Sequence, residues 1–197
     1  MIYVDELDKR IKILLHSCCA PCSSQSIEYL KDYFDISIFY YNPNITDELE
    51  FNKRLNEQIE YINKRNYLID VYTEDYSNKE FFEIAKGLED LPEGSLRCFK
   101  CYELRLRKTA LKAKELGFDS FSTTLSISPY KNSKKLNEIG EKIEKEVGIP
   151  YVYLDLKKKD GYKKSIEYSK EYNLYRQNYC GCVYSLRDYL RKCESKK

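Results

Sequence analysis

Five short segments that are largely apolar or β-branched alternate along the chain with stretches of helical period. The strand-like segments are residues 11–15, 36–41, 68–72, 118–125 and 151–156. Strands that alternate with helices are typical of α/β proteins, in which helices cover a mostly parallel sheet. We therefore expect an α/β fold: a mostly parallel five-stranded sheet covered by helices, with added C-terminal helices.

Seven further segments carry the spacing or the end signals of helices. They are residues 22–33, 46–65, 78–88, 96–116, 131–147, 161–172 and 184–192. Pro21 suits a first helical turn, Thr46 is expected to cap the second helix, and Gly117 to end the fourth. In the second helix the apolar spacing predicts four inward side chains, which are Leu49, Leu55, Ile59 and Ile62.

The length of 197 residues fits a single domain, which we expect to span residues 1–197. With 42% apolar and 34% charged residues, the composition excludes a disordered chain of low hydrophobicity. No apolar run approaches the ~20 residues of a membrane span, and the first residues lack the pattern of a signal peptide. We therefore expect a soluble, cytoplasmic protein. Thiols stay reduced in the cytosol, so clustered cysteines in a cytosolic protein bind metals or carry out redox chemistry more often than they form a disulfide framework.

Polar and sulfur-containing residues follow the ends of several predicted strands. They occupy residues 16–22, 42–44 and 122–130, and Asp155 lies at the end of the fifth strand. Parallel sheets place their functional sites beyond the carboxyl ends of the strands. The sequence therefore predicts one site at this edge.

The turn after the first strand reads His16-Ser17-Cys18-Cys19-Ala20-Pro21-Cys22. Nucleotide-binding α/β proteins carry a glycine-rich phosphate loop at this place, and no such glycines occur here. Thiols stand there instead. The single histidine, His16, is either a proton relay or metal ligand, or a hydrogen-bonded structural residue.

A second pair of thiols, Cys98 and Cys101, shares one face of the fourth predicted helix. Arg97 and Arg105 flank the pair, and nearby arginines favour the thiolate form that binds metals. Together with Cys18 and Cys19 the pair gives four thiolates from two regions of the chain. That number fits either a 4Fe–4S cluster or a structural zinc ion.

A third sulfur locus is Tyr179-Cys180-Gly181-Cys182, in which glycine lets the backbone bend so that the two sulfurs can meet. A disulfide across so short a span would be strained and easily reduced, as suits electron transfer. Two further metal ligands or two inert thiols are the alternatives. The last cysteine, Cys193, is expected to have no role.

Charge is distributed unevenly along the chain. The net charge is +2, yet residues 96–197 contain 24 basic and 13 acidic side chains. An excess of Lys and Arg suits a polyanion such as RNA, while ordinary solvated helix faces are the alternative explanation.

Four segments in order along the chain resemble those of the QueH-type epoxyqueuosine reductases. They are HSCCAPCS at 16–23, RCxxCYxxRL at 97–106, STTLSISPYKN at 122–132 and LYRQxYCGC at 174–182. The resemblance implies a nucleotide alpha-hydrolase (HUP-like) sheet. It also implies the last step of queuosine synthesis, in which the epoxide of epoxyqueuosine at the tRNA wobble position is reduced to an alkene without cobalamin.

The same resemblance implies roles for individual residues. It places a 4Fe–4S cluster on Cys18, Cys19, Cys98 and Cys101, and a redox-active disulfide on Cys180 and Cys182. A second metal, a mononuclear iron, is also implied, and we take Cys22 and Asp155 as its candidate ligands. The implied partners are the tRNA anticodon stem-loop and an unidentified electron donor. The residues expected to contact tRNA phosphates are Arg97, Arg105, Lys131, Lys134 and Lys135.

Two other functions remain open at this point. A cluster-dependent tRNA sulfurtransferase would also join such a sheet to cysteines, although it would need ATP and the glycine-rich loop is missing. A zinc-stapled RNA-binding module without catalysis is the other alternative.

Overall fold

A computed structural model describes residues 1–158 and 160–195, so position 159 and the last two residues of the expected domain lie outside the described part. Four parallel strands form its centre, in the order β4 (Val71–Thr73), β3 (Phe34–Tyr40), β2 (Ile11–His16) and β5 (Ser120–Thr123). His16, at the end of β2, pairs with Phe39 of β3 and Thr123 of β5. The carboxyl ends of the three strands therefore lie side by side.

Two short strands extend this sheet beyond β5. A single parallel bridge joins Phe121 to Tyr151, just before β6 (Val152–Tyr153), and β6 pairs in parallel with β1 (Ile2–Tyr3). The predicted α/β fold with a mostly parallel sheet is thus confirmed, although its strands form a four-stranded and a two-stranded sheet and not one sheet of five. The strand β1 was not predicted, because two residues are too short to show a period of two.

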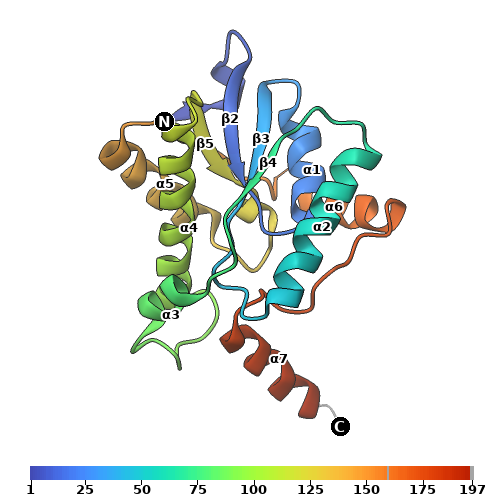
Figure 1. The fold of residues 1–197 in the computed structure, drawn as a ribbon, viewed down its shortest axis with the longest axis vertical. Helices are drawn as coiled ribbons and strands as arrows, with labels where there is room; N and C mark the ends of the chain where they lie inside the picture. The colour runs from blue at the N-terminus through green and yellow to red at the C-terminus, as the bar shows by residue number, and fades with distance from the viewer. Residues whose placement is uncertain (159, 196–197) are drawn as a thin grey trace.

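Helices cover the two faces of the sheet (Figure 1). Alternate residues of β2 point to opposite faces: Leu14 packs in one core with α4 (Leu96–Glu115) and α5 (Ser133–Val147). Ile13 and Leu15 pack in the other core with α1 (Ala20–Leu30) and α2 (Glu48–Lys64). Helix α6 (Gly161–Glu171) lies against α1.

Two helices lie away from the sheet. The short helix α3 (Lys79–Ala85) packs on α4, and α7 (Val183–Glu194) projects from the body at the C-terminal end (Figure 1). A 3₁₀ turn, η1 (Val4–Glu6), follows β1, and a second, η2 (Thr124–Ile127), follows β5. Within the described residues, none of the helices has the length and apolar character that crossing a bilayer requires.

The second helix differs from its prediction at its start and on its buried face. Asp47, not Thr46, caps α2, because its carboxylate accepts hydrogen bonds from the backbone N–H groups of Leu49 and Glu50. Leu49 is 81% exposed, and Ile59 is also exposed. The fully buried side chains of α2 include the polar residues Arg54 and Gln58, which an apolar pattern cannot identify.

Other helix bounds differ by a few residues. Helix α1 begins and ends earlier than expected, with Cys19 as its N-cap and Pro21 in its first turn. Helix α5 begins at Ser133, because the side chain of Asn132 accepts a hydrogen bond from the backbone of Lys135 and caps it. The fourth helix ends where Gly117 adopts a positive φ, as predicted.

Candidate functional site

A cavity of about 520 Å³ opens where the β2–α1 turn, the loop after β5 and the segment before α7 meet. This position, beyond the carboxyl ends of β2 and β5, is the one that the sequence predicts. Its walls include the side chains of Cys18, Cys19, Cys22, Arg54, Arg105, Tyr130, Lys131, Tyr179 and Cys180. The cavity thus combines thiols, cations and aromatic rings.

Three thiols gather at the start of α1. The sulfur atoms of Cys18, Cys19 and Cys22 all lie within 4.8 Å of one another, and those of Cys18 and Cys19 are 3.7 Å apart. Hydrogen bonds from the Cys19 and Cys22 thiols, together with the charge of Arg105, hold the pKa of Cys18 well below its usual value. The same hydrogen bonds raise the pKa values of Cys19 and Cys22. The thiolate form is therefore favoured at Cys18, and the thiol form at Cys19 and Cys22.

A buried hydrogen-bond network fixes this turn to the sheet and to α2. The hydroxyls of Ser17 and Ser23 donate to Gln58 Oε1 over 2.9 and 2.6 Å. Asn42 Nδ2 donates to the carbonyl of Ser17 over 2.9 Å, and the Ser17 N–H donates to Phe39 O over 3.1 Å. The thiols therefore stand on a rigid base.

Arg105 places a buried positive charge behind the thiols. Its side chain is 1% exposed, its Nε donates to His16 Nε2 over 3.1 Å, and its Nη2 donates to Asn42 Oδ1 over 2.5 Å. Burial and the charge of Arg105 lower the pKa of His16 to about 3, so the ring is neutral. Since Nε2 accepts, Nδ1 carries the proton and donates to Thr123 Oγ1 over 3.0 Å. His16 is therefore a hydrogen-bonded structural residue that holds Arg105.

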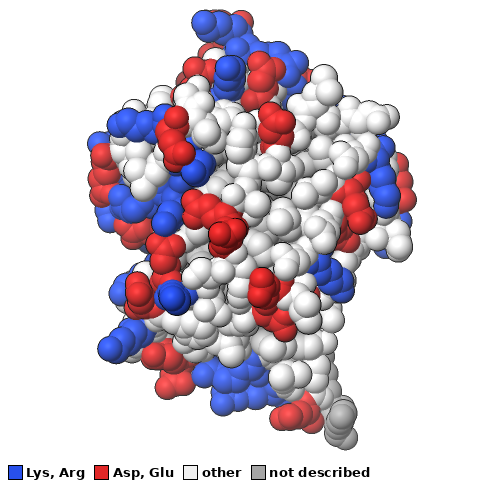
Figure 2. Space-filling model, viewed as in Figure 1, with Lys and Arg blue, Asp and Glu red and all other residues white. Residues whose placement is uncertain are grey.

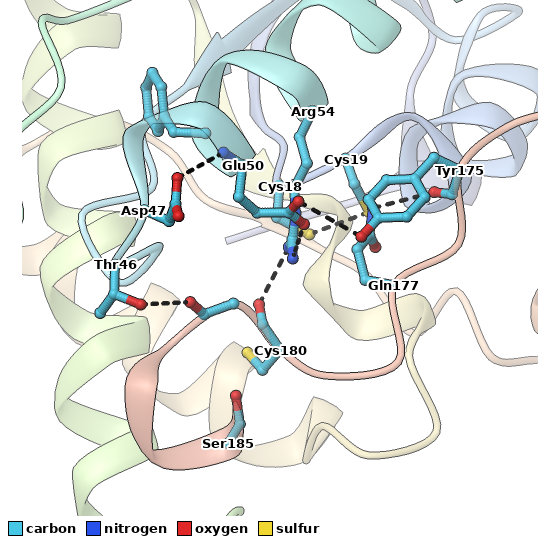
Figure 3. Close-up of polar contacts among 12 residues, drawn as sticks. Cys18, Cys19, Thr46, Asp47, Glu50, Arg54, Tyr175, Gln177, Cys180 and Ser185 are labelled. Atoms are coloured by element: carbon cyan, nitrogen blue, oxygen red, sulfur yellow. Dashed lines mark hydrogen bonds and ion pairs between the residues drawn. The ribbon is translucent and has the colours of Figure 1, made fainter. Parts of the chain in front are cut away.

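Arg54 supplies a second buried cation from α2. It is 2% exposed, pairs with Glu50 at 2.7 Å and donates from Nη1 to the carbonyl of Cys180 over 3.3 Å (Figure 3). Although burial alone would lower it, the charges of Cys19 and Glu50 raise the pKa of Arg54. Sequence reasoning missed Arg54 and Gln58. Both lie on the buried face of α2, between Phe51 and Tyr61. Their helical spacing from these two aromatic residues is the signal that could have identified them.

Lys131 is the third buried cation. It is 8% exposed, and its ammonium lies 3.3 Å from the sulfur of Cys180. Burial alone would lower the pKa of Lys131, but the interaction of its ammonium with the Cys180 sulfur raises this pKa well above its usual value. Among residues 1–158 and 160–195, no carboxylate lies within ion-pair distance of this lysine.

Cys98 and Cys101 lie one turn apart on α4, as predicted. Burial raises the pKa of Cys101 to about 12 and also raises the pKa of Cys98, whose sulfur accepts the Gly94 N–H over 3.3 Å. The charge of Arg105 acts on both Cys101 and Cys18, so the α4 pair and the β2–α1 turn adjoin the same guanidinium. In the described chain the sulfur group within 4.8 Å contains Cys22 and neither Cys98 nor Cys101.

These residues fit an anionic metal–sulfur group. Thiolate sulfurs bind iron clusters and zinc, and a cluster held by four thiolates carries net negative charge. Arg54, Arg105 and Lys131 are buried beside the thiols, and among the described residues their one paired carboxylate is Glu50, so these cations are suited to an anionic group bound by the thiols. The donor set therefore supports a metal cofactor, without distinguishing iron from zinc.

The two candidate ligands of a second metal line different cavities. Cys22 lines the cavity described above, whereas Asp155 lines a different cavity of about 270 Å³ between β1, β6 and α1. One carboxylate oxygen of Asp155 is buried there without a hydrogen-bond partner. Cys193 is exposed near the end of α7.

The basic residues expected to contact tRNA differ in exposure. Arg97 is buried and its Nη1 donates to the carbonyls of Leu88, Glu89 and Leu91, so its donors face the protein. Arg105 and Lys131 are buried as well, whereas Lys134 is exposed and Lys135 pairs with Glu138 at 3.0 Å. On the face seen in Figure 2, Lys and Arg alternate with Asp and Glu, without one continuous basic surface.

Cys180 and Cys182 flank Gly181 before α7, and each is a free thiol. Cys180 faces the cavity, while Cys182 is buried and its sulfur caps α7 by accepting the Ser185 N–H over 3.4 Å. The expected disulfide between them stays a prediction.

The chain is similar to proteins of one family over most of its length. A family model described as epoxyqueuosine reductase QueH matches residues 13–188. An epoxyqueuosine reductase QueH of Acinetobacter baylyi is 43% identical over 184 residues, which cover 92% of this chain and 83% of the relative. Relatives of the same name are 41% identical in Streptococcus pyogenes (90% of this chain, 71% of the relative) and 38% identical in Thermotoga maritima (88% and 90%).

One solved structure has a similar fold. It is described as a predicted subunit of tRNA methyltransferase from Methanocaldococcus jannaschii, with a TM-score of 0.51 and 13% sequence identity. The alignment covers 81% of this chain and 74% of that one. At this identity the similarity concerns the fold alone.

Proposed function

The chain belongs to the epoxyqueuosine reductase QueH family, as its four motifs indicated, and we propose that its thiol-lined cavity performs the family's reduction. The substrate is the epoxide of epoxyqueuosine at the wobble position of a tRNA anticodon, and the product is the alkene of queuosine. The observation that carries this proposal is the convergence of thiols and buried cations in one open cavity. With tRNA as substrate, the reaction takes place in the cytoplasm.

The overall reaction sets what the site must supply. Both carbon–oxygen bonds of the epoxide break, two electrons and two protons are taken up, and water is released. Negative charge develops on the departing oxygen, and fixed positive groups stabilise such charge without reorganising. Arg54, Arg105 and Lys131 line the cavity and are suited to this role.

We propose Cys18, Cys19, Cys98 and Cys101 as the ligands of a 4Fe–4S cluster, which supplies electrons one at a time when bound. The closeness of the Cys18 and Cys19 sulfurs, 3.7 Å apart, and the position of Arg105 beside both Cys18 and Cys101 support this set. Cys22 is then a ligand available to a second metal, a mononuclear iron. Asp155 as its second ligand stays a prediction, because it lines a different cavity.

The rim of the cavity is suited to an RNA loop. Tyr130 is 75% exposed beside Lys131, and Tyr179, Arg176 and Lys192 also line the cavity. Single-stranded nucleotides are bound by aromatic rings that stack on bases and by basic groups that contact phosphates. We propose that the anticodon loop enters here, with the exposed Lys134 and its neighbour Lys135 on the flanking phosphates.

Anaerobic incubation of the purified protein with tRNA containing epoxyqueuosine and dithionite, followed by nucleoside mass spectrometry, tests the proposal. We expect conversion to queuosine, loss of conversion in Cys18→Ser, and unchanged conversion in Cys193→Ser, which removes an exposed thiol outside the cavity. A protein that carries iron and sulfide but leaves the epoxide intact would contradict the function. A colourless, zinc-loaded protein would favour the non-catalytic RNA-binding module instead.

A further inference from the structure

Resting on the proposed function, we propose that Cys180 is the sulfur that receives electrons from an external dithiol, with Cys182 as its buried partner. We propose further that Lys131 positions Cys180 for this exchange. The two cysteines would thus have different roles, set by their surroundings.

The first observation is the unequal exposure of the two sulfurs. Cys180 is half-buried and lines the cavity, so a reagent in the cavity reaches it. Cys182 is 7% exposed and packs with Phe81, Cys101 and Tyr184. Its sulfur accepts the N–H of Ser185 at the N-terminus of α7. Only Cys180 is therefore open to attack from the cavity.

The second observation is that two consecutive backbone carbonyls, those of Cys180 and Gly181, are hydrogen-bonded to residues in α2 and just before it. Arg54 donates to the carbonyl of Cys180, and the hydroxyl of Thr46 donates to the carbonyl of Gly181 over 3.5 Å (Figure 3). The backbone N–H of Thr46 donates to the same carbonyl over 3.3 Å. Gly181 has φ +115°, and a Cβ there would lie 3.0 Å from Ile45 Cγ1. These contacts fix the orientation in which Cys180 faces the cavity.

The third observation concerns Lys131. A buried ammonium without a carboxylate partner is costly, unless another anion lies close to it. The sulfur of Cys180 at 3.3 Å is the hydrogen-bond acceptor that its Nζ has in the described structure. The backbone carbonyl of Lys131 accepts a hydrogen bond from Lys157 Nζ over 2.7 Å, which helps to hold this segment in place. The ammonium therefore holds the Cys180 sulfur in place at the cavity wall.

The exchange starts from the oxidised protein, in which Cys180 and Cys182 form a disulfide. A thiolate of the donor dithiol attacks the Cys180 sulfur, and the Cys180–Cys182 bond breaks. Cys182 leaves as a thiolate at the N-terminus of α7, where the Ser185 N–H stabilises it until it takes up a proton. The donor's second thiol loses its proton and attacks the mixed disulfide, so the donor becomes a disulfide and Cys180 leaves as a thiolate beside Lys131. Two electrons have then passed to the pair.

Trapping of mixed disulfides tests this order. The variants Cys182→Ser and Cys180→Ser are purified anaerobically, and each is treated with an aromatic disulfide probe. Labelling of the remaining cysteine is followed by mass spectrometry of peptide 177–187. We expect labelling at Cys180 to be at least about tenfold faster than at Cys182, as its access to the cavity predicts. Exposed Cys193 serves as an internal reference in every sample. Equal rates, or faster labelling of Cys182, would overturn the inference.

Substitution of the lysine tests the positioning role. In the Cys182→Ser background, Lys131→Met should slow the labelling of Cys180 about tenfold at neutral pH, and Lys131→Arg should restore most of the rate. Lys145→Met, which changes an exposed lysine of α5 outside the cavity, should leave the labelling rate of Cys180 unchanged. If Lys131→Met leaves the labelling rate of Cys180 unchanged while Cys193 is labelled normally, Lys131 does not position Cys180.

Turnover distinguishes this inference from the proposed function. Cys180→Ser should keep reduction of epoxyqueuosine by dithionite, which needs no dithiol exchange, and lose reduction driven by dithiothreitol. A protein that fails with dithionite while Cys180 is labelled selectively would contradict the function and leave the exchange order intact. Retained dithiothreitol-driven turnover in Cys180→Ser would contradict the exchange order alone.

Discussion

The two sulfur loci in the cavity are built in different ways. The thiols of the β2–α1 turn follow directly from the central strand of the sheet, and buried hydrogen bonds to Gln58 and Asn42 hold them. The Cys180–Cys182 loop comes from the C-terminal segment and is joined to the body through Arg54 and Thr46. A fixed base suits sulfurs that ligate a metal, whereas a loop reachable from the cavity suits a sulfur that exchanges.

Helix α2 connects the two loci. Gln58 faces the β2–α1 turn, and Arg54, one turn earlier, faces the C-terminal loop. Both side chains are buried and polar, so the loss of their hydrogen-bond partners would leave unsatisfied polar groups in the protein interior. The comparison implies that damage to the sheet-based locus costs more folding free energy than damage to the loop.

The largest effect is expected from Arg105→Met, which removes the cation behind the turn thiols. His16 Nε2 and Asn42 Oδ1 would lose their buried donor, and the free energy of unfolding should fall by about 3 kcal/mol. Urea denaturation of the metal-free protein measures it. Arg107→Met, on the same helix but half-buried in ion pairs with Glu103 and Glu146, should cost at most about 1 kcal/mol. Equal losses in the two variants would break the comparison.

The next effect is a pH dependence from His16. Its pKa is about 3 in the folded protein, against 6.5 as its ordinary value, so the unfolded chain binds a proton that the folded chain excludes. Stability contributed by the neutral ring is complete above pH 6.5 and is lost as the pH falls towards 3. Between pH 7 and pH 5 the free energy of unfolding of the metal-free protein should fall by about 2 kcal/mol.

Urea denaturation at several pH values measures this slope, and His16→Gln provides the reference because His16 is the only histidine of the chain. The variant should lack the slope in this range. A variant with the same slope as the unaltered protein would show that carboxylates cause it.

Much of the sheet-based locus could be predicted from the sequence. The alternation of strands and helices gives the parallel sheet, and the carboxyl ends of neighbouring strands meet at one edge, so Cys18 and Cys19 were expected at a site there. The roles of His16 and Arg105 could not be assigned. Whether a polar side chain near a site faces the cavity or the core depends on packing between segments far apart in the chain, such as β2 and α4.

The loop locus was less predictable for the same reason. Apolar spacing placed Ile62 of α2 inward correctly but also Leu49 and Ile59, which are exposed. The buried Arg54 breaks the apolar pattern, and so its contact with the Cys180 carbonyl was missed. Lys131 was expected on RNA phosphates because it lies in the basic half of a chain whose motifs imply a tRNA substrate. Its burial depends on a sulfur 49 positions away, which no local pattern indicates.

Gly181→Ala should affect the loop locus alone. Gly181 has φ +115°, which is strained for other residues, and a Cβ would also lie close to Ile45 and Arg54. The variant should lose about 1–2 kcal/mol of unfolding free energy and alter the labelling of Cys180 without affecting that of Cys18. Gly94→Ala is the matched control: its φ is +85°, and nothing lies within 4 Å of a Cβ there. It should cost less and leave Cys180 labelling unchanged.

The smallest effect is expected at the start of α2, the helix that serves both loci. Asp47→Ala removes the carboxylate that accepts the N–H groups of Leu49 and Glu50, and should cost about 1 kcal/mol. Thr46→Ala removes only a hydroxyl 3.5 Å from the carbonyl of Gly181 and should cost less. Thermal or urea unfolding compares the two variants. Because Gln58 and Arg54 lie further along α2, the cap should leave the labelling of Cys18 and Cys180 unchanged. A larger loss in Thr46→Ala would show that Thr46 stabilises the start of α2 more than Asp47 does, as the sequence predicts. The contact of Thr46 with the C-terminal loop would then matter more for stability than the Asp47 cap.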